Sequence, residues 1–488
     1  MKKKLKILHI GNIANNAFLN AKMLNETGNF SCDVLCIDYT HIMSCPEWED
    51  AIFDSSHIDH FAPDWENINL GDYQRPKWFY QGHKRIVIND ILQSKTALHT
   101  ANNKATSHKY ETTQSSNKKA TNIKNKLNKI IKIVTPRFLQ DTYKYTKKFT
   151  IKPIRARIII SKHEKEFGVL NIDLKNKFTR FELSKLIKDY RTWQKLLAHY
   201  DIVHGYAYDG IYALIHNKPY VAFEHGTIRT MPFENNYLGK LCKITYQKAN
   251  HVIITNSDNI VAAKKLNLKN YTYVPHPINE SHNQKNDLDK HLYEKHKSKF
   301  VIYHPARHDW SSKRDLHWDK GNDIFLEGFS DFTNKTNADT KLILVEWGRH
   351  VEKSKTLIKH LNIEKYIEWI DPQPHTLMMS YIRTSHIVAD QFSIGAFGSI
   401  MPKSLMAGTP CMIYLETTLL EWCFPNPPPV LNCSNSDEVS NLLCKYYENP
   451  NLLKKVSKKG VEWYNNYHSN KVVIGKLTEA YNAALKNI

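Results

Sequence analysis

The sequence has no apolar run that approaches the roughly 18 to 20 uninterrupted apolar residues of a membrane helix. Its opening segment, Met1 to Gly11, has too short an apolar run for a signal peptide. Both absences argue against an integral membrane or secreted protein, so we expect a cytoplasmic one.

The eight cysteines form no Cys-x-x-Cys pair and stand scattered at positions 32, 36, 45, 242, 411, 423, 433 and 444. Their spacing argues against a zinc ribbon or a disulfide framework, and buried free thiols are expected instead. No clear cluster of metal ligands is found elsewhere, so no metal is expected. RNA-recognition, helix-turn-helix and finger motifs are lacking too, so nucleic-acid binding would rest on charge alone.

The chain does contain enough hydrophobic residues for large cores, since they make up 41% of 488 residues, with 11% aromatic. This length exceeds what a single core usually serves, so two domains are expected. The formal net charge of +20 is unusual for a soluble protein and indicates a strongly positive surface.

Two series of short apolar runs alternate with helical patterns, as in doubly wound α/β domains. The first series predicts strands at Lys6–Ile10, Asp33–Asp38, Asp201–His204, Tyr220–Phe223 and His251–Thr255. The second predicts strands at Phe300–Tyr303, Lys341–Val345, Tyr366–Ile370, His386–Ala389 and Cys411–Tyr414. We therefore predict domains at 1–285 and 286–470, with a final helix in 471–488 that packs back across the domain boundary.

Residues from about 98 to 165 break this alternation and are treated as an insertion in the first domain. The segment holds seventeen Lys and Arg against three acidic residues, and Ile130 to Phe149 is predicted as a basic amphipathic helix. A solvated insert and a docking surface for anionic lipid headgroups or a phosphate-bearing acceptor both fit this composition. Nucleic acid is the third alternative.

Basic residues and glycines cluster where strands of the second series end. Arg307 follows one strand and Lys320-Gly321 precedes a helix, which suits a diphosphate because guanidinium and ammonium groups offset its charge. Asp390 to Gly398 follows another strand and opens a helix, Ser399 to Ala407, whose free N–H groups suit phosphate. Surface solvation is the alternative for the two cations.

Two strand ends of the first series carry further candidates. Gly11 and Asn12 follow the first strand and fit a close backbone approach to a ligand. Glu224-His225-Gly226 ends the fourth strand, where His225 would face a cleft and either bind sugar or steer an acceptor hydroxyl. A structural histidine is the other interpretation.

These segments resemble the GT-B glycosyltransferases, specifically the large retaining family 4. Asp201–His204, Pro219–Gly226, Lys248–Ser257 and Val274–Asn279 resemble its first-domain strands and interdomain segment. In the second half, Arg307 and Lys320-Gly321 stand where the family keeps its phosphate-contacting Arg and Lys, and Glu346-Trp347-Gly348 resembles a further turn. Gly395–Gly398 with Ala407–Pro410 matches the donor loop and helix in spacing.

The match departs from the family at two positions. The family usually carries two glutamates around this loop, one facing the sugar and one bonding the ribose hydroxyls, and here those positions hold Gly395 and Lys403. A lysine cannot accept the ribose bonds and would meet phosphate or another carboxylate instead. Asp390 and Gln391 are candidates for replacing a lost contact, and a capping or packing role is the alternative.

The resemblance implies an α/β chain of GT-B type, with two Rossmann-like domains facing each other across a cleft. It implies a glycosyltransferase that moves a sugar from a nucleoside diphosphate to a glycan or lipid-linked glycan, as in cell-envelope polysaccharide assembly, with retention and without metal or cofactor. The predicted catalytic residues are Glu224, His225, Arg307 and Lys320. The predicted donor site comprises Gly11, Asn12, Arg307, Lys320, Gly348, Asp390, Gln391, Gly395, Ala396, Phe397, Gly398 and Lys403. A noncatalytic sugar- or nucleotide-binding protein is the alternative.

Overall fold

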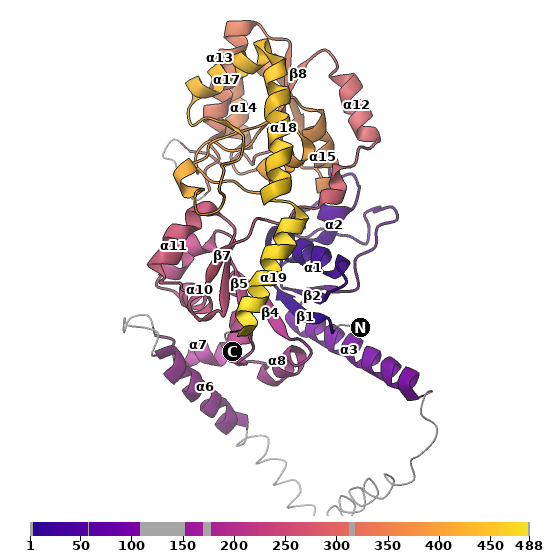
Figure 1. The fold of residues 1–488 in the computed structure, drawn as a ribbon, viewed down its shortest axis with the longest axis vertical. Coiled ribbons are helices and arrows are strands. Elements are labelled where there is room, and N and C mark those ends of the chain that lie inside the picture. The colour runs from indigo at the N-terminus through magenta and orange to yellow at the C-terminus, as the bar shows by residue number, and fades with distance from the viewer. Residues whose placement is uncertain (1–2, 57, 108–151, 169–176, 312–317, 487–488) are drawn as a thin grey trace, which may run out of the picture.

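Two wholly parallel β-sheets, one in each half of the chain, organise the fold (Figure 1). The computed structural model describes residues 3–56, 58–107, 152–168, 177–311 and 318–486. We call the part around the first sheet the N-terminal domain and the part around the second sheet the C-terminal domain.

The sheet of the N-terminal domain has seven strands in the order β3-β2-β1-β4-β5-β6-β7. They span Leu5–Ile10 (β1), Phe30–Ile37 (β2), Phe79–Gly82 (β3), Ile202–Tyr206 (β4), Tyr220–Phe223 (β5), His251–Ile254 (β6) and Tyr271–Tyr273 (β7). Helices cover it, so central strands such as β5 are buried throughout and read as continuous apolar runs. The strand order reverses between β1 and β4, which is where a doubly wound sheet opens a crevice.

The helices of the N-terminal domain follow or precede these strands. They span Asn16–Glu26 (α1), Pro46–Asp50 (α2), Lys84–Ser107 (α3), Lys152–Gly168 (α6), Arg180–Leu186 (α7), Tyr190–Leu197 (α8), Ile211–Ile215 (α9), Tyr237–Lys248 (α10) and Ile260–Lys265 (α11). The α3 and α6 helices extend into both ends of the basic insertion, whereas the amphipathic helix predicted for Ile130 to Phe149 lies outside the described residues.

The sheet of the C-terminal domain has six strands in the order β10-β9-β8-β11-β12-β13. They span Phe300–His304 (β8), Thr340–Val345 (β9), Ile367–Ile370 (β10), Ile387–Ala389 (β11), Cys411–Ile413 (β12) and Leu431–Asn432 (β13). Its helices span Asp287–Lys295 (α12), Asn322–Thr336 (α13), Val351–His360 (α14), His375–Thr384 (α15), Ile400–Ala407 (α16), Ser436–Glu448 (α17) and Pro450–Tyr467 (α18).

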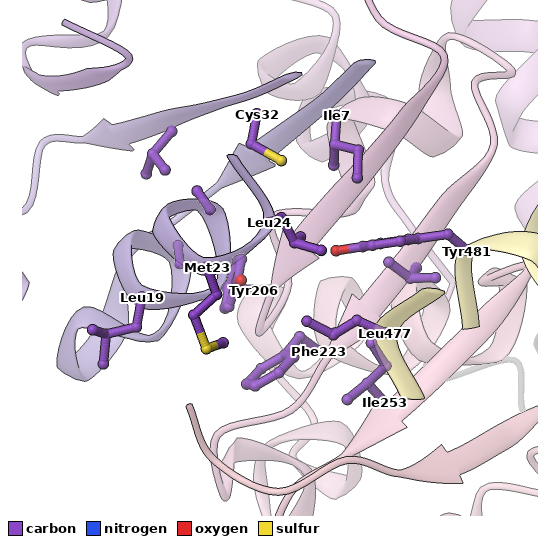
Figure 2. Close-up of a cluster of buried hydrophobic side chains, with 14 of the residues drawn as sticks. Ile7, Leu19, Met23, Leu24, Cys32, Tyr206, Phe223, Ile253, Leu477 and Tyr481 are labelled. Carbon is purple, nitrogen blue, oxygen red and sulfur yellow. The ribbon is translucent and has the colours of Figure 1, made fainter. Parts of the chain in front are cut away.

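The last helix, α19 (Asn470–Lys486), belongs spatially to the N-terminal domain. The chain leaves the C-terminal domain through α18, and α19 then packs against α1, β5 and β6. Figure 2 shows Leu477 and Tyr481 of α19 in one cluster with Ile7, Phe223 and Ile253. The first domain therefore completes its core with residues from the far end of the chain.

All ten strands expected from the sequence are present, and three further strands, β3, β7 and β13, are added at or near sheet edges. All eight cysteines are free, six of them buried and Cys423 and Cys444 half-buried. Within the described ranges, no helix combines the length and the apolar character that crossing a bilayer requires.

Candidate functional site

A cavity of about 600 Å³ lies between the two domains, at the carboxyl ends of both sheets. Its N-terminal wall comes from the loops after β1 and β2 and the loop before β3, namely Ile13, Ala14, Tyr39, His41, Met43, His60 and Phe61. Its C-terminal wall comes from the loops after β8 and β9, namely Arg307, Asp309, Glu346, Trp347, Gly348 and Arg349. Ligands of doubly wound sheets bind in this kind of place.

Arg307 lies in this cavity and is held by a buried carboxylate. Its Nη1 is 3.7 Å from Oδ2 of Asp309, and its side chain stays 47% exposed. Asp309 also accepts hydrogen bonds from the backbone nitrogen and Nε of Arg349, at 3.0 and 3.1 Å. Burial disfavours the Asp309 carboxylate, but these hydrogen bonds and both arginine charges lower its pKa. The guanidinium of Arg307 is thus oriented and still free to meet an anion.

Lys320 is near enough to Arg307 for the two charges to interact, although it is not among the residues that line the cavity. Its Nζ donates to Oε1 of Gln391 at 2.6 Å. Burial lowers the pKa of Lys320 to about 8, Asp390 raises it, and the charges of Arg307 and Arg229 lower it further. Because like charges are held together here, this part of the cleft favours an anionic ligand.

Arg229, which the sequence analysis missed, brings a third cation from the other domain. It follows His225-Gly226 in a short 3-10 turn and binds Asp258 through Nε at 2.5 Å and Nη2 at 2.8 Å. A polar residue three positions beyond a strand-end glycine is too common to single out. Only the fold shows that its charge reaches Lys320.

The donor loop predicted after β11 divides into packed and open parts. Ala396 and Phe397 are buried in the core, and Gly395 is buried with φ +73°. A Cβ on Gly395 would lie 3.1 Å from Cβ of Glu416, so a glutamate there is strained and crowded. Gly398 differs, because a Cβ there would meet nothing within 4 Å. The open side of the loop is therefore at Gly398, beside the first turn of α16.

Asp390 and Gln391 lie behind that opening and are almost fully buried. The Gln391 side chain accepts from Lys320 and donates to the carbonyl oxygen of Ala396, so it ties the lysine to the loop. Asp390 accepts a hydrogen bond from the backbone of Met401 in α16, which is a capping contact. Gln391 thus helps to hold Lys320 in place, and Asp390 helps to hold the start of α16.

Lys403 is buried, and its charge acts on the Glu49 carboxylate of the N-terminal domain. It is 2% exposed, and its Nζ lies 3.1 Å from Nδ1 of His375, which also contacts Oε2 of Glu49 in α2. Burial disfavours the Glu49 carboxylate, but His375, Lys403 and His282 together hold its pKa well below its usual range. Lys403 thus contacts His375 directly, and its charge acts on the Glu49 carboxylate.

Glu224 faces the protein interior, away from the cleft. It is fully buried, and its oxygens accept hydrogen bonds from the backbone of Thr255 (2.8 Å) and Asn256 (2.9 Å), from Gly226, and from the Asn259 side chain (2.5 Å). Burial opposes ionisation, but these hydrogen bonds and Arg229 lower its pKa. This geometry makes Glu224 a positioning residue for the loops after β5 and β6, in place of the catalytic role expected from the sequence.

His225 is half-buried over aromatic rings of the same edge. It stacks on Tyr206 with ring centroids 5.4 Å apart, and its Nε2 has no hydrogen-bond partner among the described residues. Burial lowers its pKa to about 3, Glu224 opposes that effect, and His276 adds to it. His225 is therefore neutral at physiological pH and is suited to exchanging hydrogen bonds with a hydroxyl group.

The glycines predicted as close-approach points have defined surroundings. Gly11 has φ +93°, and a Cβ there would lie 2.6 Å from Oδ2 of Asp209. Gly348 has φ +120° and its Cβ would lie 2.5 Å from the His308 nitrogen, so only glycine fits this wall of the cavity. Asn12 does not face the cleft, since it is 1% exposed and bonds Asn15 and the Ser44 carbonyl.

The chain also contains an Asp-x-Asp pattern, Asp287-Leu288-Asp289, at the start of α12. Asp289 completes a capping box with Asn286 and pairs with Arg383 at 2.7 Å. Its carboxylate is thereby committed to structural contacts. Within the described ranges, no group of three or more His, Cys, Asp or Glu is placed to hold a metal ion.

The sequence matches no protein-family model, and no curated protein matches it. Among solved structures, HepE from Anabaena in complex with UDP and glucose is 13% identical over 61% of this chain and 81% of HepE, with a TM-score of 0.48. Sucrose-phosphate synthase from Thermosynechococcus elongatus is 12% identical over 62% of this chain and 80% of that chain, with a TM-score of 0.47. A putative UDP-N-acetylglucosamine 2-epimerase from Listeria monocytogenes is 10% identical over 100% and 98%, also with a TM-score of 0.47.

These similarities are low, so the assignment of the fold rests on the elements of this chain itself. Two parallel sheets turn their carboxyl ends toward one shared cavity, and the last helix returns to the first domain. This is the GT-B arrangement expected from the sequence.

Proposed function

We propose that the chain is a glycosyltransferase that takes its sugar from a nucleoside diphosphate, as its GT-B architecture suggests. The observation that carries this proposal is that the charges of Arg307 and Arg229, one from each domain, both act on Lys320, which bonds Gln391 in the loop that leads to α16. Two arginines that act on one buried lysine, together with a helix terminus that opens to free space at Gly398, favour an anion with more than one negative charge.

In the proposed reaction, a hydroxyl oxygen of the acceptor bonds to the anomeric carbon of the sugar while the bond to the diphosphate oxygen breaks, and the hydroxyl proton passes to an oxygen of the departing diphosphate. Negative charge then grows on the departing diphosphate. Arg307, Lys320 and the N–H groups near Gly398 offset that charge, with no metal required. Because the fold holds these groups in place beforehand, they reorganise little during bond breaking.

The acceptor side of the proposal involves the N-terminal domain and its basic insertion. His225 is placed to exchange hydrogen bonds with an acceptor or donor hydroxyl, and retention of configuration is taken from the resemblance to family 4 alone. The insertion, with seventeen basic and three acidic residues, supports an acceptor at an anionic membrane surface, such as a lipid-linked glycan of cell-envelope polysaccharide. Pelleting with anionic and with neutral liposomes tests this part, and equal binding to both would contradict it.

Calorimetric titration of the full chain with UDP, GDP and ADP tests the donor site. We expect one of these nucleotides to bind, and Arg307→Ala and Lys320→Ala to weaken that binding at least tenfold, since charge-assisted contacts contribute about 1.5–3 kcal/mol each. Lys359→Ala, exposed near the end of α14, is the matched control. Unchanged affinity in both cleft variants would overturn the placement of the diphosphate.

One observation favours a noncatalytic binding protein as the second candidate. The positions of the two family glutamates hold Gly395, which is crowded, and Lys403, which is engaged with His375 and Glu49. A binding protein would hold the sugar nucleotide without releasing free nucleoside diphosphate. Assays of hydrolysis and transfer with the nucleotide sugar that binds best separate the two candidates.

A further inference from the structure

Asp390, at the end of β11, combines deep burial with an unused hydrogen-bonding atom. The residue is 6% exposed, and its Oδ2 is buried without a hydrogen-bond partner among the described residues. The carboxylate accepts a hydrogen bond from the backbone nitrogen of Met401, in the first turn of α16. A buried carboxylate oxygen without a hydrogen-bond partner lowers the free energy of unfolding, so its presence here points to a functional use.

The space in front of Asp390 is where the proposed diphosphate would be held. A Cβ on Gly398, which precedes α16, would meet nothing within 4 Å, and Lys320, in the loop before α13, interacts with the Asp390 carboxylate. A phosphate that engages Lys320 and the N–H groups of α16 shares both with the Asp390 carboxylate. Two anions would then compete for the same donors in a poorly hydrated site, and that arrangement is unfavourable unless one of them is neutralised.

The groups packed around Asp390 make its carboxylate, and not the phosphate, the anion that is neutralised. Lys320 is the nearest cation, His304 on β8 is buried and bonded to the Ala389 carbonyl at 2.8 Å, and Cys411 on β12 is a buried thiol. Lys403, on α16 itself, interacts with Glu49. Burial raises the pKa of Asp390 to about 6, while Lys320 and the Met401 hydrogen bond oppose the shift. Little further change is needed to protonate it at neutral pH.

We propose that Asp390 takes up a proton from solvent when a diphosphate binds, and that the resulting carboxylic acid donates a hydrogen bond to a phosphate oxygen. The proton is returned to solvent when the diphosphate leaves. This inference rests on the proposed function, and it adds that binding at this site consumes a proton. A carboxylic acid kept neutral in a buried site is a known way to supply a donor to an oxyanion.

Calorimetric titration of the full chain with inorganic pyrophosphate, in buffers of different ionisation enthalpy, counts the protons taken up. At pH 7.5 the wild type should take up close to one proton more than Asp390→Asn, and comparing the two at one pH cancels the ligand's own ionisation. Between pH 7 and pH 8 the wild-type dissociation constant should rise up to about tenfold relative to the variant. The asparagine amide donates at every pH, so the variant should still bind.

Asp339→Asn is the matched control, because Asp339 precedes β9, at the amino ends of the strands and away from Asp390 at their carboxyl ends, and pairs with Lys299. It should behave as the wild type does. Infrared difference spectra of the unmodified protein provide a second measurement, since pyrophosphate should produce the carbonyl band of a protonated carboxyl group.

Two results would overturn the proposal, and they differ in what else they affect. If Arg307→Ala abolishes pyrophosphate binding while wild type and Asp390→Asn take up equal numbers of protons, only the role of Asp390 is lost. If neither pyrophosphate nor UDP, GDP or ADP binds the wild type, the proposed function is lost as well.

Discussion

Nδ1 of His375 lies 3.1 Å from Nζ of Lys403 and also contacts Glu49, so residues of the two domains share one buried nitrogen. Glu49 is fully buried and Lys403 nearly so. Nearby contacts join the same surfaces, since Thr376 donates to the Ala51 carbonyl at 2.8 Å. Lys403 and His375 of the C-terminal domain are therefore joined to Glu49 of the N-terminal domain across the boundary.

Reversing the charge of Lys403 should destabilise the protein strongly. Lys403→Glu replaces the buried cation that acts on Glu49 by a second buried carboxylate, and leaving a buried charge uncompensated costs about 3–5 kcal/mol. Combining it with Glu49→Lys should recover part of that loss because the opposite charges are restored. Urea unfolding of wild type, both single variants and the double variant measures the coupling. Strict additivity of the two single effects would contradict a direct interaction.

A glutamate at position 395 should also be unfavourable. Gly395→Glu puts a side chain at φ +73°, with its Cβ 3.1 Å from Cβ of Glu416, and such strain costs about 1–3 kcal/mol. Gly398→Ala, in the same loop but facing open space, is the control and should unfold within about 0.5 kcal/mol of the wild type. Thermal unfolding compares the two, and an unchanged Gly395→Glu would show that the loop rearranges freely.

The Arg229–Asp258 pair should set how strongly the N-terminal domain attracts a diphosphate. Arg229→Gln removes one of three cations and should weaken pyrophosphate binding about tenfold, which corresponds to about 1.4 kcal/mol. Asp258→Asn removes the carboxylate that binds Arg229 through both nitrogens and should strengthen binding. Changes in the same direction in both variants would indicate a structural role for the pair.

Stability should fall between pH 7 and pH 5 because of buried neutral histidines. Burial lowers the pKa of His9 to about 3, whereas the unfolded chain takes up this proton near 6.5. The unfolded state therefore binds more protons as pH falls, and His9 alone costs about 2 kcal/mol at pH 5. His9→Gln should flatten the dependence by that amount in urea unfolding at both pH values. An identical pH slope in the variant would show that His9 ionises within the folded protein.

The central strands were predictable from sequence because helices cover both faces of each sheet. Tyr220–Phe223 and Phe300–Tyr303 are continuous apolar runs, and runs of this kind are typical of buried parallel strands. The strands missed were short ones such as Leu431–Asn432, whose two residues leave no pattern. A strand was therefore predictable from the sequence when it was both buried and long enough to leave an apolar run.

The candidate site was only partly predictable, for a different reason. Arg307 and Lys320 follow motif spacing within one domain, whereas Arg229 and Glu49 act on the site across the domain boundary. Local sequence carries no signal for such contacts. Glu224 shows the converse, since a strand-end carboxylate beside a histidine gives the same pattern whether it faces a cleft or the backbone of Thr255.

The return of α19 to the first sheet has a consequence for biosynthesis. Val473, Leu477, Ala480, Tyr481 and Ala484 fill the same core as Ile7 and Phe18. The N-terminal domain emerges from the ribosome long before these five residues have been synthesised. The half that is synthesised first is thus the last to be finished, and the nascent chain must keep an apolar groove open, or shielded by a chaperone, until translation has passed residue 484.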